Sequence, residues 1–225
     1  MGDVSWIFDL VSPDDSVRGR ALARHQAAVA EGRTALHWMN SVWARAGTPA
    51  PAEPWLAAEM DQARAAMDWH NKQTIFGLLD GFHSDDALVR EMHAPFVVLY
   101  LVWEGSFPDE WRDPASCSWS PWTRKAALLA SLAREGVPDV IRSQMTDLLI
   151  GALYRSYRCK DWIYAAMVRH LSDQSFVAKI TELLDAEDPL VRLRAEYILY
   201  LAEFPETVVR RKTWRRWLAG ELQRR

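Results

Sequence analysis

Cysteine is scarce in this chain of 225 residues, which has only Cys117 and Cys159. Two cysteines cannot build the dense disulfide framework of a small secreted domain, so a reduced, cytoplasmic protein fits them better. No apolar run approaches the length that a bilayer requires, and the acidic N-terminus lacks the positive region of a secretory signal. We therefore expect a cytoplasmic protein that does not enter a membrane.

Several motifs of catalysis and metal binding are also missing. The sequence has no G-x-S-x-G, no P-loop and no G-x-G-x-x-G, which removes the usual signals for hydrolases, nucleoside triphosphatases and dinucleotide-binding enzymes. Its six histidines form no H-x-x-x-H pair and neither cysteine belongs to a C-x-x-C, so we expect neither a metal nor a cofactor. Paired aspartates at 14–15 and 85–86 could suit a hard cation, but their place just before a helix favours capping.

Alternating strand patterns are absent, and apolar residues recur instead at helical spacing. Hydrophobic residues make up 49% of the chain, which at this length is enough for one large core. We therefore expect a single all-α domain over residues 1–225. The net charge of −3 gives no overall attraction to nucleic acid.

The clearest helical pattern spans residues 176–204. Apolar residues on one face of each half predict two helices, and an acidic turn separates them. In that turn Asp188 can cap the second helix, and Pro189 suits its first turn. Each helix has an apolar face that the pair cannot bury by itself, so the hairpin needs neighbours.

The same scheme occurs twice earlier, at residues 6–21 and 75–90. In all three places a Val-Arg pair follows the acidic turn, and its arginines, Arg18, Arg90 and Arg192, lie 72 and 102 residues apart. These separations are near two and three times a unit of about 35 residues, which is typical of stacked helical repeats. We predict that Arg192 is structural and pairs with an aspartate of a turn.

The turn acids, the Val-Arg pair and the small residue three positions later (Ala21 and Ala195) resemble the HEAT-repeat family, including the shorter variety found in bilin-lyase-type proteins. The middle unit departs from this pattern, with His93 in place of the small residue. The resemblance covers roughly half of the chain. It implies a right-handed α-solenoid of about five or six helical hairpins with an extended concave surface.

The periodicity and the breakers divide the chain into helices. We expect them over residues 4–11, 14–31, 34–46, 53–70, 72–80, 86–104, 121–135, 138–156, 161–171, 174–185, 188–203 and 205–220. Pro95 should kink its helix. Residues 105–120, rich in proline, serine and aromatic rings, predict an irregular insertion on the surface that covers one end of the groove.

Aromatic residues around this insertion form one candidate site. They are Trp103, Phe107, Trp111, Trp119 and Trp122. With the acidic residues between them, they could wall a pocket for a cation or a flat organic ligand. The alternative is that the rings fill the gap left by a missing repeat helix.

A second group surrounds Asp161 and comprises Tyr154, Tyr157, Arg158, Trp162, Tyr164 and Arg169. An aspartate between aromatic and basic residues is distantly similar to the groove of HEAT-like DNA glycosylases, which implies a catalytic role for Asp161. Their Trp-Trp-Asp run is absent here, because Asp161 is followed by Trp162 and Ile163. The alternative is that Asp161 caps a helix.

The C-terminal segment combines an apolar stripe with a cluster of basic residues. The basic residues are Arg210, Arg211, Lys212, Arg215 and Arg216. Basic amphipathic helices can contact anionic surfaces or nucleic acid. The alternative is a terminal helix that closes the last repeat with its apolar face and leaves its basic face in solvent.

The sequence therefore favours a binding or scaffold module that holds a protein or peptide in a concave groove, with a small molecule second and nucleic acid third. Its candidate contact residues are Tyr100, Trp103, Glu104, Trp122, Tyr157, Trp162 and Arg169. The alternative is an enzyme on the same scaffold. It would be either a base-excision enzyme like the DNA glycosylases, with Asp161 as the catalytic residue, or a small-molecule enzyme with an aromatic-lined groove.

Overall fold

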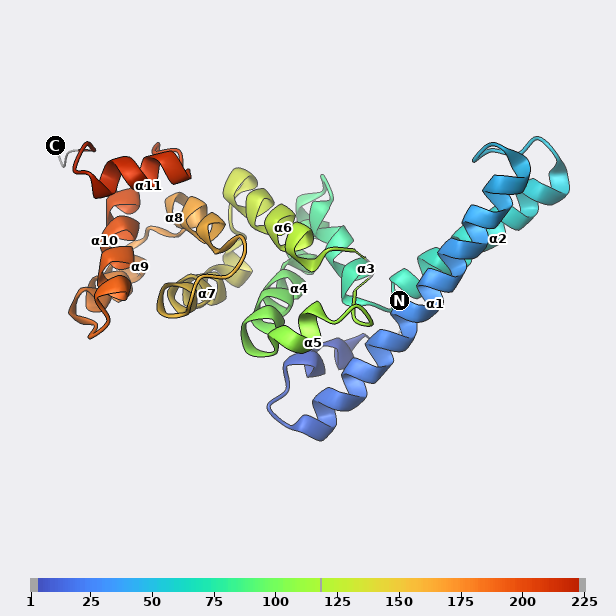
Figure 1. The fold of residues 1–225 in the computed structure, drawn as a ribbon, viewed down its shortest axis with the longest axis horizontal. Coiled ribbons are helices and arrows are strands. Elements are labelled where there is room, and N and C mark those ends of the chain that lie inside the picture. The colour runs from blue at the N-terminus through green and yellow to red at the C-terminus, as the bar shows by residue number, and fades with distance from the viewer. Residues whose placement is uncertain (1–3, 118, 223–225) are drawn as a thin grey trace. The chain divides into compact units, whose positions relative to one another are not determined.

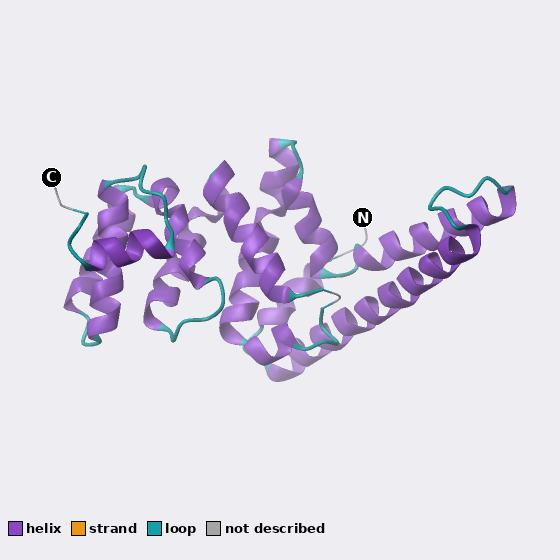
Figure 2. Ribbon diagram, turned by 45° about the horizontal axis from the view of Figure 1, so that its top comes forward, coloured by secondary structure: helices purple, strands orange, loops and turns teal. Residues whose placement is uncertain are grey.

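The computed structural model describes residues 4–117 and 119–222. Within these residues every regular element is a helix and no strand occurs, which confirms the all-α class (Figure 2). The chain divides into two compact units, residues 1–121 and 122–225. The expectation of one continuous domain stays a prediction.

The first unit consists of helical elements, where η marks a 3-10 helix. They are η1 (Ser5–Val11), α1 (Asp15–Ala46), α2 (Pro54–Asn71), α3 (Ile75–Asp80), η2 (Gly81–His83), α4 (Ala87–Ser106) and α5 (Pro108–Arg112). The second unit begins within the first turn of α6. Its elements are α6 (Pro121–Glu135), η3 (Asp139–Ile141), α7 (Arg142–Tyr154), η4 (Asp161–Met167), α8 (Val168–Leu171), α9 (Gln174–Glu182), η5 (Leu183–Asp185), α10 (Pro189–Glu203) and α11 (Arg211–Leu218).

Helices α1 and α2 pack side by side as a long antiparallel hairpin (Figure 1). The break predicted at Gly32 is wrong, because α1 runs through it without interruption. Thr34 does not cap a new helix there; its hydroxyl donates to the carbonyl of Ala30 at 3.2 Å, as hydroxyls inside a helix do. The helix ends at Gly47, whose φ of 67° is the left-handed conformation that glycine adopts without strain.

The three acidic turns have the same local structure. In each, an aspartate side chain caps the second helix: Asp14 accepts from the amide of Val17, Asp86 from that of Val89, and Asp188 from that of Leu190. The residue two positions before each aspartate has extended backbone, with ψ of 135°, 143° and 142°. The capping role predicted for these acids is confirmed, and the recurrence extends from sequence to backbone geometry.

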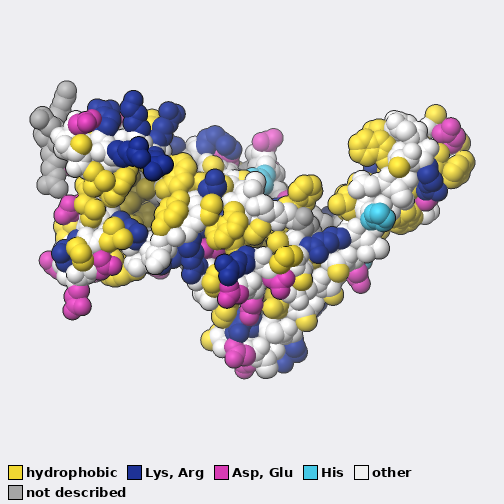
Figure 3. Space-filling model, in the orientation of Figure 1, with side chains coloured by type: hydrophobic (Ala, Val, Ile, Leu, Met, Phe, Trp, Pro, Cys, Tyr) yellow, Lys and Arg dark blue, Asp and Glu magenta, His cyan; other side chains and the backbone are white. Residues whose placement is uncertain are grey.

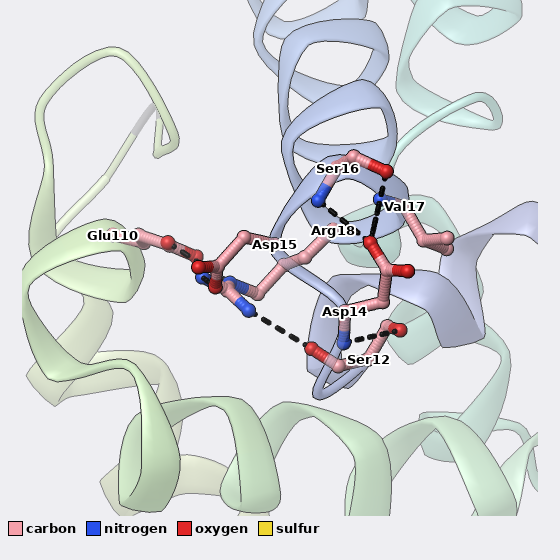
Figure 4. A network of polar contacts seen from close by, with 7 residues as sticks. All are labelled: Ser12, Asp14, Asp15, Ser16, Val17, Arg18 and Glu110. Carbon is pink, nitrogen blue, oxygen red and sulfur yellow. Dashed lines mark hydrogen bonds and ion pairs between the residues drawn. The ribbon is translucent and has the colours of Figure 1, made fainter.

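The arginine after the turn donates hydrogen bonds to backbone carbonyl groups at the end of the preceding helix. Arg18 donates to the carbonyl of Ser12 at 3.0 Å, and Arg192 donates to the carbonyl of Ala186 at 2.6 Å, in each case six residues back. Arg18 also pairs with Asp15 at 2.6 Å and Glu110 at 3.1 Å (Figure 4). The prediction that Arg192 pairs with an aspartate is wrong, because its guanidinium donates instead to the backbone carbonyls of Ala186 and Glu187 in the turn.

Residues 105–120 contain more regular structure than the sequence predicts. Residue 118 lies outside the described residues. Helix α4 continues to Ser106, α5 follows, and Trp111 is only 1% exposed. Arg18 lies over the ring of Phe107 at 4.0 Å, and Arg33 donates to the carbonyls of Pro114 and Cys117. The prediction of an irregular segment is therefore wrong for Gly105–Ser106 and Pro108–Arg112, which are helical, and the contacts of Arg18 and Arg33 hold the segment against α1.

The core of the first unit contains one histidine among aromatic rings. His25 of α1 is completely buried, with Phe76 at 5.5 Å and Trp103 at 5.4 Å between ring centroids. Neither of its ring nitrogens has a hydrogen-bond partner in the described residues. Burial lowers the pKa of His25 from 6.5 to about 4, because the charged form would have to give up water.

Replacing Arg192 with alanine should destabilise the protein through the turn. The change leaves two carbonyl groups without their donor, which costs on the order of 1–2 kcal/mol. For a chain of this size that corresponds to a fall in melting temperature of about 2–8 °C. Arg215→Ala, which removes an exposed arginine of α11, is the matched control and should leave the melting temperature unchanged. Equal melting of the two variants would contradict the structural role of Arg192.

Stability should fall on acidification because of His25. Its pKa is lowered in the folded state, so the unfolded chain binds the extra proton below pH 6.5 and stability is lost between about pH 6.5 and 4. The full loss is roughly 3 kcal/mol. Denaturant unfolding across this range should show a shallower pH dependence in His25→Leu than in the parent chain. His37→Gln, at an exposed position of the same helix, should keep the dependence of the parent.

Candidate functional site

Asp161 lies at the centre of a buried cluster of charges in the second unit. Its carboxylate accepts from the ammonium of Lys125 at 2.6 Å and from the guanidinium of Arg155 at 2.8 Å. The backbone amide of Arg158 donates to its second oxygen at 2.9 Å. The Lys125 side chain is completely buried, and that of Asp161 is 6% exposed. Both carboxylate oxygens are therefore used within the protein.

The local fold brings these groups together from three places. Lys125 comes from α6, Arg155 directly follows the last residue of α7, and Asp161 begins η4. Between the last two the chain turns back on itself, and Lys160 adopts a φ of 71°, which is uncommon for a residue with a Cβ. The aspartate predicted to cap a helix thus binds the amide of the turn before it, while its charge is met by two cations.

Aromatic rings enclose the lysine. The Lys125 ammonium lies 5.8 Å from the ring centroid of Trp122 and 5.6 Å from that of Tyr164, within the range of cation–π attraction. Burial acts to raise the pKa of Asp161, but the hydrogen bonds from Arg155 and Lys125 outweigh it and hold the pKa below its ordinary value. A carboxylate that is ionised, paired and covered is suited to fixing structure.

Exposed aromatic side chains lie next to this cluster in the sequence. Tyr154 is 56% exposed, Tyr157 63% and Trp162 48%. They come from the end of α7, the following loop and the start of η4, the same segments that carry Arg155 and Asp161. The charge cluster therefore fixes a short stretch of chain that presents three large rings to solvent.

Arg169, another predicted contact residue, is bound to the protein itself. It donates to the carbonyl of Ala133, where His170 also binds at 2.9 Å. In the same way Arg194 of α10 donates to the carbonyls of Leu153 and Arg155 at the end of α7. These side chains complete helix C-termini, which otherwise leave carbonyl groups without donors.

The candidates from the first unit belong to its core. Tyr100, Trp103 and Glu104 are all at most 1% exposed. Tyr100 packs against Trp111 with 5.4 Å between ring centroids, and Trp103 packs against His25. The prediction that these three side chains contact a partner is wrong, because α4 turns them inward. Trp122 is half-buried and Trp119 is 73% exposed, so the aromatic group around the insertion is divided between packing and solvent.

Sequence reasoning missed the two cations that neutralise Asp161. A signal for Lys125 was present: it stands three, four and seven residues before Leu128, Leu129 and Leu132, on the apolar face of α6. A lysine in such a stripe needs a buried acidic partner. Which acid this is depends on the fold, since Asp161 is 36 residues away.

Charged residues are distributed unevenly between the two units, which the net charge of the whole chain does not reveal. Residues 1–121 contain 9 Lys and Arg against 17 Asp and Glu, a net charge of −8, whereas residues 122–225 contain 18 against 13, a net charge of +5. On the face of the second unit seen in Figure 3, basic side chains gather where Figure 1 places α11, beside an area of hydrophobic side chains. The two units therefore carry net charges of opposite sign.

No family model matches this chain, and no curated protein or solved structure matches it either. Among the described residues, no three His, Cys, Asp or Glu side chains are grouped so that they could hold a metal ion. None of the described helices combines the length and the apolar character needed to cross a membrane.

Asp161→Asn should reduce stability strongly. The change removes the negative charge that compensates the buried Lys125 and the half-buried Arg155, and breaking a buried ion pair from one side costs about 3–5 kcal/mol. Lys125→Met should cost less, because Arg155 and the Arg158 amide still satisfy the carboxylate. Chemical denaturation of the three proteins checks this order. An Asp161→Asn variant as stable as the parent would contradict the structural role.

Proposed function

We propose that this protein is a cytoplasmic binding module of the HEAT-like kind, in which helical hairpins stack as a right-handed solenoid and hold a partner protein or peptide. Support for the repeat comes from the three turns at Asp14, Asp86 and Asp188, which share caps and backbone geometry. Repeats of this type offer extended surfaces and need no catalytic groups to function.

The observation that carries the proposal is the contrast between Asp161 and its neighbours. The one carboxylate proposed for catalysis is occupied by Lys125, Arg155 and a backbone amide. Tyr157 and Trp162, on either side of it in the chain, present their rings to solvent. Large exposed aromatic side chains on a fixed backbone are typical anchors of protein interfaces.

The alternative, a base-excision enzyme, gains from the positive charge of the second unit, since phosphate contacts dominate affinity for nucleic acid. The environment of Asp161 argues more strongly against this alternative, because a catalytic carboxylate must reach the reacting atoms of the substrate. In this fold the same carboxylate would have to leave two cations to do so. Binding without chemistry is therefore the function that the geometry supports best.

The proposal predicts that the exposed rings of Tyr157 and Trp162, and not Asp161, determine which partner protein is bound. The tagged full-length chain should capture a specific protein by cross-linking in cells, and Tyr157→Ala/Trp162→Ala should abolish that capture without lowering the melting temperature. Trp69→Ala is the matched control, because that ring is 63% exposed on α2. It should leave the captured protein unchanged.

The enzyme alternative has its own measurement. Purified protein is incubated with alkylated duplex DNA at low salt, and released base is quantified. Base release that disappears in Asp161→Glu, a variant that keeps the negative charge, would overturn the binding proposal. Capture that depends on Tyr157 and Trp162, with no base release, would support it.

A further inference from the structure

The last helix of the chain, α11, is attached to the protein by aromatic rings. Trp214 packs on Tyr197 with 4.7 Å between ring centroids, and Trp217 lies 5.1 Å from Tyr197 and 6.5 Å from Tyr200. The two tryptophans also stack on each other at 5.2 Å. The apolar side of α11 is thus covered by tyrosines of α10, which fixes which side of the helix faces solvent.

The opposite side of α11 carries a cluster of positively charged side chains. Arg211, Lys212 and Arg215 are exposed, and among the described residues their side chains form no ion pair or hydrogen bond. Arg216 differs, since it pairs with Glu221 at 3.2 Å. Unpaired cations fixed on one side of a helix attract an acidic partner.

Apolar side chains border these cations. Leu218 is 48% exposed and follows Arg211 and Arg215 at helical spacing of four and then three residues, so the three form one stripe. Val208, just before the helix, is 61% exposed. A partner that covers this surface must therefore bring acidic groups for the arginines and apolar groups for Leu218 and Val208.

We propose that the stripe Arg211–Arg215–Leu218 binds an acidic, amphipathic segment of another protein, one that alternates Asp or Glu with large apolar residues. This deepens the binding function proposed above and rests on it. Peptides of this kind dock as helices whose apolar residues enter a hydrophobic surface, with charges matched at its edge.

Two other polyanions fit the surface less well. A membrane-surface helix inserts its apolar side into the lipid, but here Trp214 and Trp217 are already packed on α10. Single-stranded nucleic acid stacks its bases on exposed rings, and the rings of α11 are covered in the same way. Nucleic acid, in addition, offers no apolar complement to the exposed aliphatic side chains of Leu218 and Val208.

The test is selection of a randomised peptide library on the full-length chain at low ionic strength. The expected result is enrichment of peptides that combine Asp or Glu with Leu, Ile, Phe or Trp. A synthetic peptide from that selection should bind less tightly as salt rises. Its affinity should fall by about tenfold or more in Arg211→Glu/Arg215→Glu, because like charges then face each other.

Controls separate this surface from charge in general. Arg20→Glu/Lys72→Glu makes the same change in net charge at exposed positions of the first unit and should alter affinity by less than about twofold. Leu218→Asp should weaken the selected peptide but not a polyglutamate peptide of equal charge. Both variants of α11 should melt like the parent, since they alter solvent-facing side chains.

Several results would overturn the proposal. They are selection without enrichment of acidic residues, equal affinity for polyglutamate and the selected peptide, unchanged binding in Arg211→Glu/Arg215→Glu, and tighter binding to a single-stranded oligonucleotide or to anionic phospholipid vesicles. Any of these leaves the general binding function standing if capture still depends on Tyr157 and Trp162. Loss of that dependence, with peptide binding to α11 retained, would instead overturn the site proposed around Asp161.

Discussion

The turn between two successive helices is the constraint on which the rest of this structure depends. A helix that ends leaves carbonyl groups without donors, and a helix that begins leaves amides without acceptors. Here one aspartate, such as Asp188, supplies the acceptor, and the arginine four residues later, Arg192, supplies the donor. Because both groups lie within a few residues, the turn fixes the angle between two helices. That angle decides which apolar faces can meet the neighbouring helices.

Arginine performs the same task over longer distances in the second unit. Arg169 completes the end of α6 at Ala133, and Arg194 completes the end of α7 at Leu153. The Lys125–Asp161 pair also joins two elements of this unit, α6 and η4. It costs more free energy of desolvation, because two buried charges must each be compensated by a partner. An apolar pair of similar volume could be as stable. The ion pair adds a specific match between α6 and η4, since any other packing would leave a charge unpaired in the interior.

Different side chains of this protein stabilise the fold and face solvent, where a partner could contact them. In the first unit Asp14 and Asp86 cap helices and Asp15 and Glu110 pair with Arg18. The aromatic contact residues predicted there, Tyr100 and Trp103, belong to the core. In the second unit Asp161 pairs internally with Lys125 and Arg155. In α11, Arg211, Lys212 and Arg215 are exposed and have no ion pair among the described residues, whereas Arg216 pairs with Glu221. Charged side chains that are not used in ion pairs within the fold can attract an oppositely charged partner molecule.

The sequence by itself determined the helical class, the three acidic turns and the aspartates that cap them, because these depend on the spacing of apolar residues and on groups a few positions apart. It could not determine that α1 passes through Gly32, where α2 packs closely enough to place His70 beside it. It also could not decide that Tyr100, Trp103 and Glu104 face inward, or that Lys125 is the partner of Asp161. These outcomes depend on which helices meet, and so on contacts between residues far apart in the chain that no local pattern specifies.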